Sequence, residues 1–332
     1  MANEKLDVLA VGDTTIDAFI RLTDAEVHCT VNRERCELCL RFGDKVPYDS
    51  VTVLPAVGNA ANAAVSAARL GLRSGFLGWV GDDENGTFCI ETLAGERVDT
   101  SLMTKEPGVP TNYHFVLWFG AERTILVRHE RYSYRFPAHI DAPRFLYLSS
   151  LGEHARPYHA EIARYLMAHP DTQLAFQPGT FQIRMGRETL KEIYAQTSLF
   201  FCNKGEAKSI LGTQEDDPRA LLSALRALGP RAAIITDERN GAYAMNADGA
   251  WQVPMYPDPA PPLERTGAGD AFSSTVVAAL ALGKTLPEAL AWGPVNAMSV
   301  VQRVGAREGL LSLEALSRLL AEAPATYAVS SL

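Results

Sequence analysis

Short apolar runs separated by longer amphipathic segments dominate the second half of the chain. The runs lie at Phe145–Leu148, Gln173–Phe176, Leu199–Cys202 and Ala232–Thr236. Runs this short, alternating with segments of helical character, are typical of buried strands. Strands that alternate with helices form a parallel sheet covered by helices on both faces. The pattern therefore predicts an α/β fold built on a mostly parallel sheet.

The first half of the chain begins in the same way. Leu6 to Gly12 is an apolar run that ends in glycine, as a buried first strand would. Ala60 to Leu70 is rich in alanine, has apolar residues at helical spacing and is followed by Gly71, which is a typical helix stop. Phe76 to Val80 predicts a second strand, and Glu84 to Leu93 predicts the helix that follows it.

Two segments interrupt this alternation. Arg21 to Pro55 is rich in Thr, Val, Cys and charged residues and has no helical period, so we expect strands of an accessory sheet. Tyr113–Phe119 and Thr124–Val127, separated by residues 120–123, predict a β-hairpin that can pair with the first segment. Near the other end, the proline-rich Pro254–Pro262 leads to three predicted helices. They are Ala271–Leu282, Pro287–Arg303 and Leu313–Glu322.

Composition narrows the class of protein. The net charge of −8 argues against nucleic acid or an anionic membrane as the partner. No apolar run approaches the roughly 20 residues of a membrane span, and the N-terminus lacks the features of a signal peptide. Five cysteines in 332 residues do not suggest a disulfide scaffold. We therefore expect a cytoplasmic protein with a small-molecule partner.

The strongest chemical signal is the segment Arg265–Phe272, which indicates a loop that opens a helix. Gly267, Ala268 and Gly269 leave their backbone amides uncovered, and the first turn of a helix has N–H groups without internal partners. Such a turn binds anions, so an aspartate there, Asp270, makes sense as a base beside a phosphate in transfer. The alternative is that Asp270 stands at the helix start for purely local reasons.

Polar residues gather at other predicted strand ends. Asn203 and Glu206 follow the strand Leu199–Cys202, where Glu206 can hold hydrated Mg²⁺; the pair also suits a helix-start capping box. Two further groups, Asp13 with Asp17 and Gly58 with Asn59 and Asn62, suit the hydroxyls of a polyol. Solvated turns and helix capping are the alternatives for these two groups.

Together these motifs resemble the ribokinase-like, or PfkB, family of carbohydrate kinases over most of the chain. The resemblance is carried by Gly12 and Asp17, Gly58–Ala63, Leu70-Gly71, Gly78–Asp83, Asn203-x-x-Glu206, Thr266–Phe272 and Gly305-Ala306. It implies a three-layer α/β/α sandwich in a single domain, residues 1–332. It also implies a small β-sheet lid, formed by about 19–56 and 109–131, that covers the sugar and often mediates dimerisation. We therefore expect a homodimer through the lid.

The resemblance also implies roles for individual residues. Asp270 would be the base, and Gly267, Ala268 and Gly269 the anion hole. Substrate-binding positions are Asp13, Asp17, Gly58, Asn59, Asn62 and Arg128. Nucleotide-binding positions are Asn203, Thr236, Gly241, Thr266, Gly267, Gly269 and Asn296, with Glu206 near Mg²⁺, most simply through water. ATP and Mg²⁺ are the implied cosubstrate and cofactor.

The chain departs from the family pattern at three places. Val57-Gly58 replaces the usual Gly-Gly pair, and residues 237–241 replace a commoner Thr-x-Gly. Glu264-Arg265-Thr266-Gly267 replaces Asp-Thr-Thr-Gly, whose Asp helps to hold potassium in several members. The requirement for a monovalent cation is therefore open.

The predicted lid holds unusual chemistry. Cys36-x-x-Cys39, with Cys29 and His28 nearby, has zinc-ligand spacing, whereas thiols on a strand can also be small hydrophobes. Arg128 and Arg131 can bind an anionic group on the substrate; a charged strand edge is the alternative.

The sequence thus predicts an ATP-dependent kinase that phosphorylates a primary hydroxyl of a small sugar of the ribose or fructose type. A purine nucleoside kinase shares every motif, and a catalytically silent sugar or nucleotide sensor of the same fold is the alternative from another class. A nicotinamide dehydrogenase and a P-loop enzyme fit poorly, because neither glycine-rich signature occurs.

Overall fold

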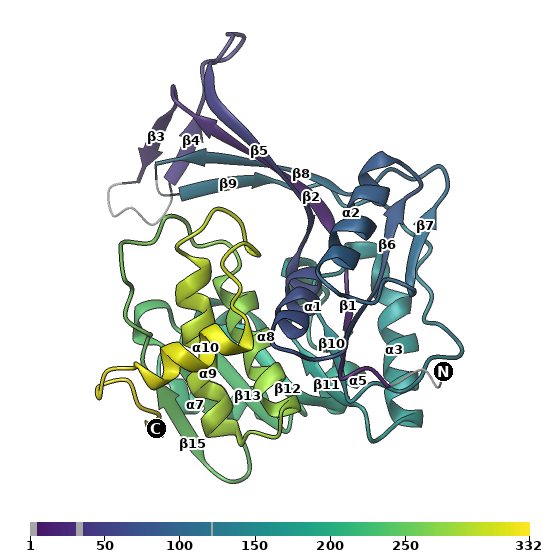
Figure 1. Ribbon diagram of the computed structural model, residues 1–332, viewed down its shortest axis with the longest axis vertical. Helices are drawn as coiled ribbons and strands as arrows, with labels where there is room; N and C mark the ends of the chain where they lie inside the picture. The colour runs from purple at the N-terminus through teal and green to yellow at the C-terminus, as the bar shows by residue number, and fades with distance from the viewer. Residues whose placement is uncertain (1–4, 31–35, 121) are drawn as a thin grey trace.

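A ten-stranded, mostly parallel sheet forms the centre of the molecule in the computed structural model, which describes residues 5–30, 36–120 and 122–332 (Figure 1). The strand order is β16-β15-β14-β13-β12-β11-β10-β1-β6-β7, and only β14, β15 and β16 pair antiparallel. The bounds are β1 (Val8–Val11), β6 (Ser74–Gly81), β7 (Met103–Glu106), β10 (Phe145–Leu148), β11 (Gln173–Phe176), β12 (Thr197–Asn203), β13 (Ala232–Thr236), β14 (Ala242–Met245), β15 (Ala250–Val253) and β16 (Ser330–Ser331). The predicted α/β fold is confirmed.

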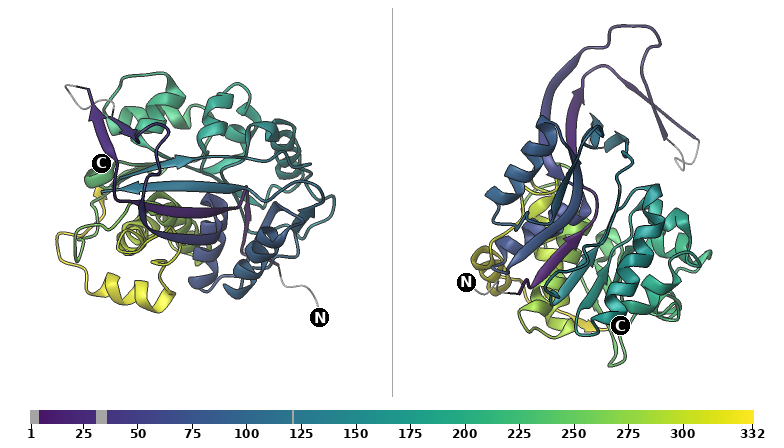
Figure 2. Two further views of the ribbon diagram at one scale, coloured as in Figure 1. Left: turned by 90° about the horizontal axis from the view of Figure 1, so that it is seen from above. Right: turned by 90° about the vertical axis from the view of Figure 1, so that its right-hand side faces the viewer.

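Helices cover both faces of this sheet, because successive strand residues point to opposite sides (Figure 2). Val8 and Ala10 of β1 belong to one apolar cluster, and Leu9 and Val11 to the other. The first cluster includes residues of α1 (Asn59–Arg69), α2 (Glu84–Gly95), α8 (Ala268–Ala281), α9 (Leu286–Val300) and α10 (Leu313–Ala321). The second includes residues of α3 (Arg156–Ala168), α5 (Lys191–Gln196), α6 (Lys204–Leu211) and α7 (Pro218–Arg226), and Met185 of α4 (Thr180–Met185) packs against it. The molecule therefore has three layers.

A four-stranded sheet, called the small sheet here, stands apart from the main body (Figure 1). Its order is β5 (Tyr48–Val57), β2 (Thr15–Leu22), β8 (Tyr113–Phe119) and β9 (Glu122–Leu126). The hairpin β8–β9 thus pairs with the first accessory segment, as the sequence predicts, through the parallel pair β2–β8. The first accessory strand begins at Thr15, earlier than predicted, because the chain enters the small sheet almost directly from β1.

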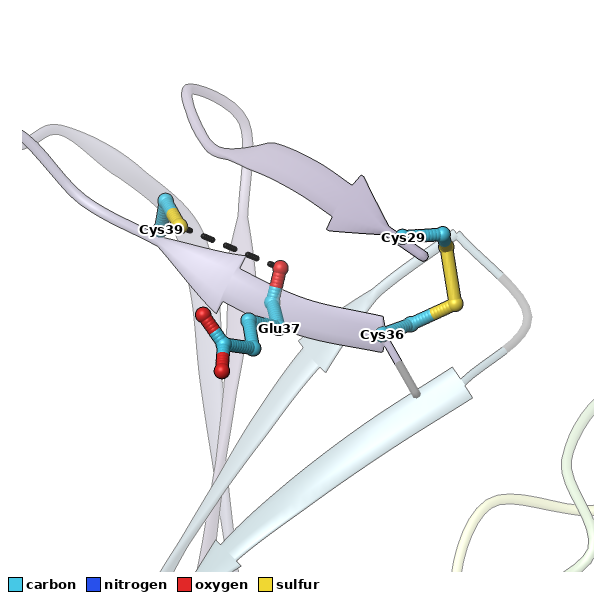
Figure 3. Close-up of a disulfide and its surroundings, with 4 residues drawn as sticks. All are labelled: Cys29, Cys36, Glu37 and Cys39. Carbon is cyan, nitrogen blue, oxygen red and sulfur yellow. Dashed lines mark hydrogen bonds between the residues drawn. A yellow bond between two sulfur atoms is a disulfide. The ribbon is translucent and has the colours of Figure 1, made fainter. Parts of the chain in front are cut away.

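A separate hairpin, β3 (Glu26–Cys29) with β4 (Cys36–Cys39), extends from the small sheet and corrects the zinc interpretation (Figure 3). Cys29 and Cys36 face each other across the hairpin and form a disulfide. Cys36 and Cys39 are three residues apart on one strand, so their side chains point to opposite faces. In the part of the chain that the structure describes, no group of three His, Cys, Asp or Glu side chains is arranged to hold a metal ion.

Three predictions fall partly outside the described residues. They concern the N-terminus (residues 1–4), the accessory segment (31–35) and the hairpin turn (121). Among the described residues, none of the helices has the length and apolar character needed to cross a membrane.

Candidate active site

A cavity of about 380 Å³ lies between the large sheet and the small sheet. Asp13 follows β1, Ser150 follows β10 and Thr180 follows β11, so the carboxyl ends of three parallel strands deliver residues to it. Ligands of open α/β sheets bind at this edge. The small sheet contributes Asp17 and His114. Residues from two strands of the small sheet, β2 and β8, thus meet residues of the main body in one space.

Asp270 lies in this cavity, in the first turn of α8. Its side chain is largely buried (8% exposed) and accepts hydrogen bonds from Asn62 Nδ2 at 2.9 Å and Gln177 Nε2 at 3.1 Å. Burial raises the pKa of Asp270 to about 6, against the lowering effect of those two bonds. The Tyr147 hydroxyl donates a hydrogen bond to Gln177 Oε1 and so fixes the orientation of that amide. A carboxylate with this pKa, held in one orientation, can act as a general base near neutral pH.

The start of α8 is built around Gly267. This residue has φ +78°, and a Cβ atom there would lie 2.2 Å from the Cβ of Ala306, so glycine is required by both conformation and space. No side chain caps the helix, and the N–H of Ala271 is the donor to the carbonyl of Gly267. The amides of Ala268, Gly269 and Asp270 precede that first bond, which makes this turn suitable for an anion.

Glu264, where the chain departs from the family pattern, supports this turn. Its buried carboxylate accepts hydrogen bonds from the backbone N–H and the hydroxyl of Thr266, and from Gly305 N at 2.9 Å. Arg123 of β9 lies 3.7 Å from the same carboxylate, which joins the small sheet to the loop before α8. Arg265, in contrast, is exposed.

Three buried polar atoms in the cavity wall have no hydrogen-bond partner among the described residues. They are Asp17 Oδ1, Asn62 Oδ1 and His114 Nε2. His114 Nδ1 lies 3.3 Å from Asp17 Oδ1, within ion-pair distance but without the geometry of a hydrogen bond, and the two residues are neighbours in the β2–β8 register. Buried polar groups are normally paired, so these atoms have hydrogen-bonding capacity left for a molecule in the cavity. His114 lines the candidate site, and sequence reasoning missed it.

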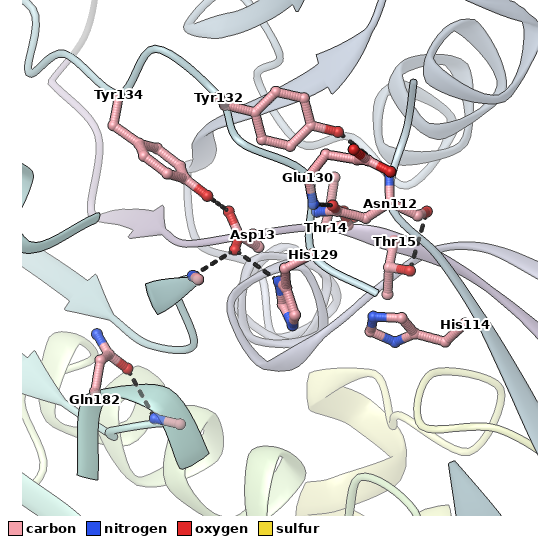
Figure 4. A network of polar contacts seen from close by, with 12 residues as sticks. Asp13, Thr14, Thr15, Asn112, His114, His129, Glu130, Tyr132, Tyr134 and Gln182 are labelled. Carbon is pink, nitrogen blue, oxygen red and sulfur yellow. Dashed lines mark hydrogen bonds and ion pairs between the residues drawn. The ribbon is translucent and has the colours of Figure 1, made fainter. Parts of the chain in front are cut away.

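The carboxylate of Asp13, in contrast, already has hydrogen-bond donors within the protein (Figure 4). It accepts hydrogen bonds from Gly152 N at 2.8 Å, from His129 Nδ1 at 3.1 Å and from the Tyr134 hydroxyl at 2.7 Å. Burial and the charge of Asp13 raise the pKa of Tyr134 far above its usual value, so its hydroxyl stays a donor. Asp13 therefore ties the segment after β9, which carries His129 and Tyr134, to the end of β1. It also lines the cavity.

The other predicted substrate positions divide into two groups. Gly58 and Asn59 line the cavity, and Gly58 has φ +115° with the Asp13 carbonyl 2.9 Å from where a Cβ would be. Arg128 does not reach the cavity: its side chain is 72% exposed and pairs with Glu130 at 2.6 Å. Its neighbour Val127 lines the cavity instead, because adjacent residues of extended chain point to opposite sides.

The predicted nucleotide and metal positions lie outside this cavity, apart from Thr266. Asn203 Oδ1 accepts from Glu206 N, and Glu206 Oε2 accepts from Asn203 N, both at 2.8 Å, so the capping-box interpretation is confirmed. Burial raises the pKa of Glu206, and the charge of Asp270 adds to this effect. Thr236 pairs with Asn203 between adjacent strands.

Two other predicted nucleotide positions have structural roles of their own. Gly241 has φ +85°, and a Cβ there would lie 2.0 Å from the Val253 carbonyl, so the turn requires glycine. Asn296 is fully buried: it donates to Thr275 Oγ1 at 2.7 Å and accepts from Leu311 N at 2.9 Å. The structure therefore does not bring Asn296 to the site.

The fold and the site define an α/β enzyme with a buried carboxylate at a helix start, beside a cavity for a small molecule. The chain belongs to the pfkB family of carbohydrate kinases, whose family model matches residues 8–313. It is thus a sugar kinase of the ribokinase/PfkB family.

Similar proteins support the same family. Ribokinase of Bacillus subtilis is 27% identical, over 84% of this chain and 92% of that protein. Fructokinase of Klebsiella pneumoniae is 30% identical, over 72% of this chain and 81% of that protein. Among solved structures, Arabidopsis thaliana ribokinase complexed with ribose and ATP has a TM-score of 0.78 at 17% identity, over 95% of this chain and 99% of that one. Methanocaldococcus jannaschii nucleoside kinase has the same TM-score at 18% identity, over 96% of this chain and 99% of that one. These two structures support the fold.

Proposed function

We propose that the protein transfers the γ-phosphate of ATP to a primary hydroxyl of a small sugar bound in the cavity, with Asp270 as the base. The observation that carries this proposal is the position of Asp270. Its buried carboxylate, with a pKa of about 6, opens onto the same cavity as the polar atoms of Asp17, Asn62 and His114 that have no hydrogen-bond partner among the described residues. A sugar held by those atoms would present a hydroxyl close to a base.

The chemistry follows from these groups. As the hydroxyl oxygen of the sugar forms its bond to the γ-phosphorus, the hydroxyl proton passes to the carboxylate of Asp270. The bond from phosphorus to the bridging oxygen breaks, and ADP leaves with that electron pair. The amides of Ala268, Gly269 and Asp270, in the uncapped first turn of α8, would stabilise the charge on the phosphoryl oxygens.

The residues present fit ATP and Mg²⁺. The uncapped turn of α8 suits phosphate, and we propose Asn203, Thr236, Gly241 and Thr266 as further nucleotide contacts. One carboxylate oxygen of Glu206 is used by Asn203 N, and the other can hold a water of hydrated Mg²⁺, which binds proteins through few carboxylates. When bound, Mg²⁺ would neutralise charge on the phosphates.

A screen for ADP release tests this function. The purified protein with ATP and Mg²⁺ is assayed against sugars, phosphosugars and nucleosides, each with and without potassium, and the Asp270→Asn variant gives the background. We expect turnover with at least one sugar. Turnover with nucleosides alone would identify a nucleoside kinase instead. No turnover with any acceptor would favour a silent sensor.

We propose further that the small sheet is a lid and that a second copy of this chain covers its outer face. The inner face carries Asp17 and His114, which line the cavity. The outer face exposes apolar side chains: Val51 and Val53 are each 45% exposed, Phe115 44% and Leu126 51%. Neighbouring strands bring these residues together, since Phe115 pairs with Ala18 and Leu126, and Ala18 pairs with Val53. A face of this kind marks an interaction surface.

The mass in solution tests the homodimer. We expect light scattering to give twice the chain mass for the wild type and the single-chain mass for Phe115→Lys, because the lysine would place a charge in the apolar contact. Phe88→Lys is the matched control, since Phe88 is 48% exposed but lies on α2. A monomeric wild type at micromolar concentration, or a dimeric Phe115→Lys variant, would contradict the proposal.

A further inference from the structure

The charged side chains that line the cavity differ in whether they have hydrogen-bond or ion-pair partners within the protein. Asp270 accepts two hydrogen bonds, Asp13 accepts three, and Asp17 lies beside His114. None of these carboxylates is paired with Arg184, which also lines the cavity. Arg184 has no ion pair or side-chain hydrogen bond within the described parts of the chain, although its guanidinium carries five N–H donors. The cavity therefore has a cation with open hydrogen-bonding capacity.

Arg184 is exposed, and its guanidinium lies over an aromatic residue of the cavity wall. Its guanidinium carbon lies 5.9 Å from the ring centre of Phe181, a neighbour on α4 that also lines the cavity. The ring of Phe181 stands nearly perpendicular to the ring of His129, with their centres 5.1 Å apart. His129 is in turn hydrogen-bonded to Asp13. Phe181 thus packs against a side chain tied to the end of β1. Contact with an aromatic face favours a defined place for the guanidinium.

We propose that the sugar acceptor carries an anionic group, a carboxylate or a phosphate, that binds Arg184. This inference rests on the proposed function. A guanidinium matches both groups, because its planar N–H fork donates two parallel hydrogen bonds to a pair of oxygens. In this arrangement Asp17, Asn62 and His114 bind hydroxyls, Asp270 faces the reacting hydroxyl, and Arg184 binds the charge. Arg128, for which the sequence left an anion-binding role open, is occupied by Glu130 outside the cavity.

Matched acceptors and variants test the role of Arg184. Each set contains a neutral sugar, the corresponding sugar acid and the corresponding sugar monophosphate, so the two anion types are separate arms. For the wild type we expect kcat/KM to be higher for one of the anionic acceptors than for the neutral sugar. In Arg184→Ala the ratio of anionic to neutral kcat/KM should fall roughly 10–100-fold, mainly through KM, as expected for loss of a charge-assisted hydrogen bond. Arg184→Lys should restore part of that ratio.

Arg187→Ala is the control, because Arg187 is exposed like Arg184 but follows the end of α4 and does not line the cavity. Its ratio should equal that of the wild type. Equal kcat/KM for neutral and anionic acceptors in the wild type, or an unchanged ratio in Arg184→Ala, would overturn the inference. If no acceptor is phosphorylated, the proposed function fails, and calorimetric titration with the same sugar acids and phosphates then decides the role of Arg184. Binding by the wild type that is weakened in Arg184→Ala supports it, whereas no binding, or equal binding by both proteins, overturns it.

Discussion

Replacing Asp270 with Asn is expected to lower kcat by at least about 100-fold, with little change in the affinity for nucleotide. The substitution keeps the size of the side chain and removes its ability to take the proton of the sugar hydroxyl. The new amide would face two donors, Asn62 Nδ2 and Gln177 Nε2. Asn62 can turn its amide, because its Oδ1 has no partner, so the site should keep its shape.

Three measurements decide the outcome for this variant. Steady-state kinetics give kcat, calorimetric titration gives nucleotide affinity, and circular dichroism checks the fold. Turnover of Asp270→Asn within a few-fold of the wild type would remove Asp270 from the mechanism.

The pH dependence gives an independent readout for Asp270. The base must be ionised to work and burial raises its pKa to about 6, so wild-type kcat/KM should fall below about pH 6. Stability should depend on pH in the opposite direction. The folded-state pKa lies above the unfolded value, so folding favours the protonated form, and that stability is lost as pH rises through about 6. The Asp270→Asn variant has no carboxylate to ionise at this position and should not lose stability in this way. In urea denaturation, its free energy of unfolding relative to the wild type should therefore increase between pH 4 and pH 8.

The sequence alone was sufficient for the elements whose signals are local. Strands β10, β11 and β13 have the predicted bounds because short buried strands in a parallel sheet consist of continuous apolar residues. The presence of α8 was also predictable, since a glycine-rich loop before an apolar helix is a local pattern, although the helix begins at Ala268 and not at the predicted Ala271. Asp270 entered the prediction for this reason.

Contacts between distant segments could not be predicted in the same way. His114 reaches the cavity because it pairs with Asp17 across β2–β8, and nothing next to His114 in the sequence indicates that register. Asp13 was predicted to bind substrate from its residue type, yet its partner Tyr134 is 121 residues away. Glu264 was noted as a departure from the family, and its structural role depends on Gly305, 41 residues later.

Arg184 illustrates a further limit of the sequence. It stands on the short helix α4 with no motif around it, and its proposed role emerges only when the partners of the other charged groups are known. The cysteines show the same dependence on geometry, because the spacing of Cys36 and Cys39 suits zinc only where the chain is not a strand.

Replacing Gly267 with Ala is expected to lower both stability and kcat, the latter by about 10²-fold, as for loss of an oxyanion donor. An alanine there would keep an unfavourable φ near +78° and bring its Cβ to 2.2 Å from the Cβ of Ala306. The backbone must move to relieve this contact, and the amides of Ala268 and Gly269 would move with it. The effect on kcat should therefore exceed the effect on KM for the sugar, whose contacts are elsewhere in the cavity.

Gly283→Ala separates backbone strain from displacement of the anion site. Gly283 follows the other end of α8 with φ +85°, and a Cβ there would meet nothing within 4 Å. It should cost about 1–2 kcal/mol of unfolding free energy from the left-handed conformation alone and leave kcat unchanged. Gly267→Ala should cost more in urea denaturation and lose turnover as well. Equal destabilisation by the two variants, with wild-type kcat in both, would show that the turn at Gly267 does not position the phosphoryl group.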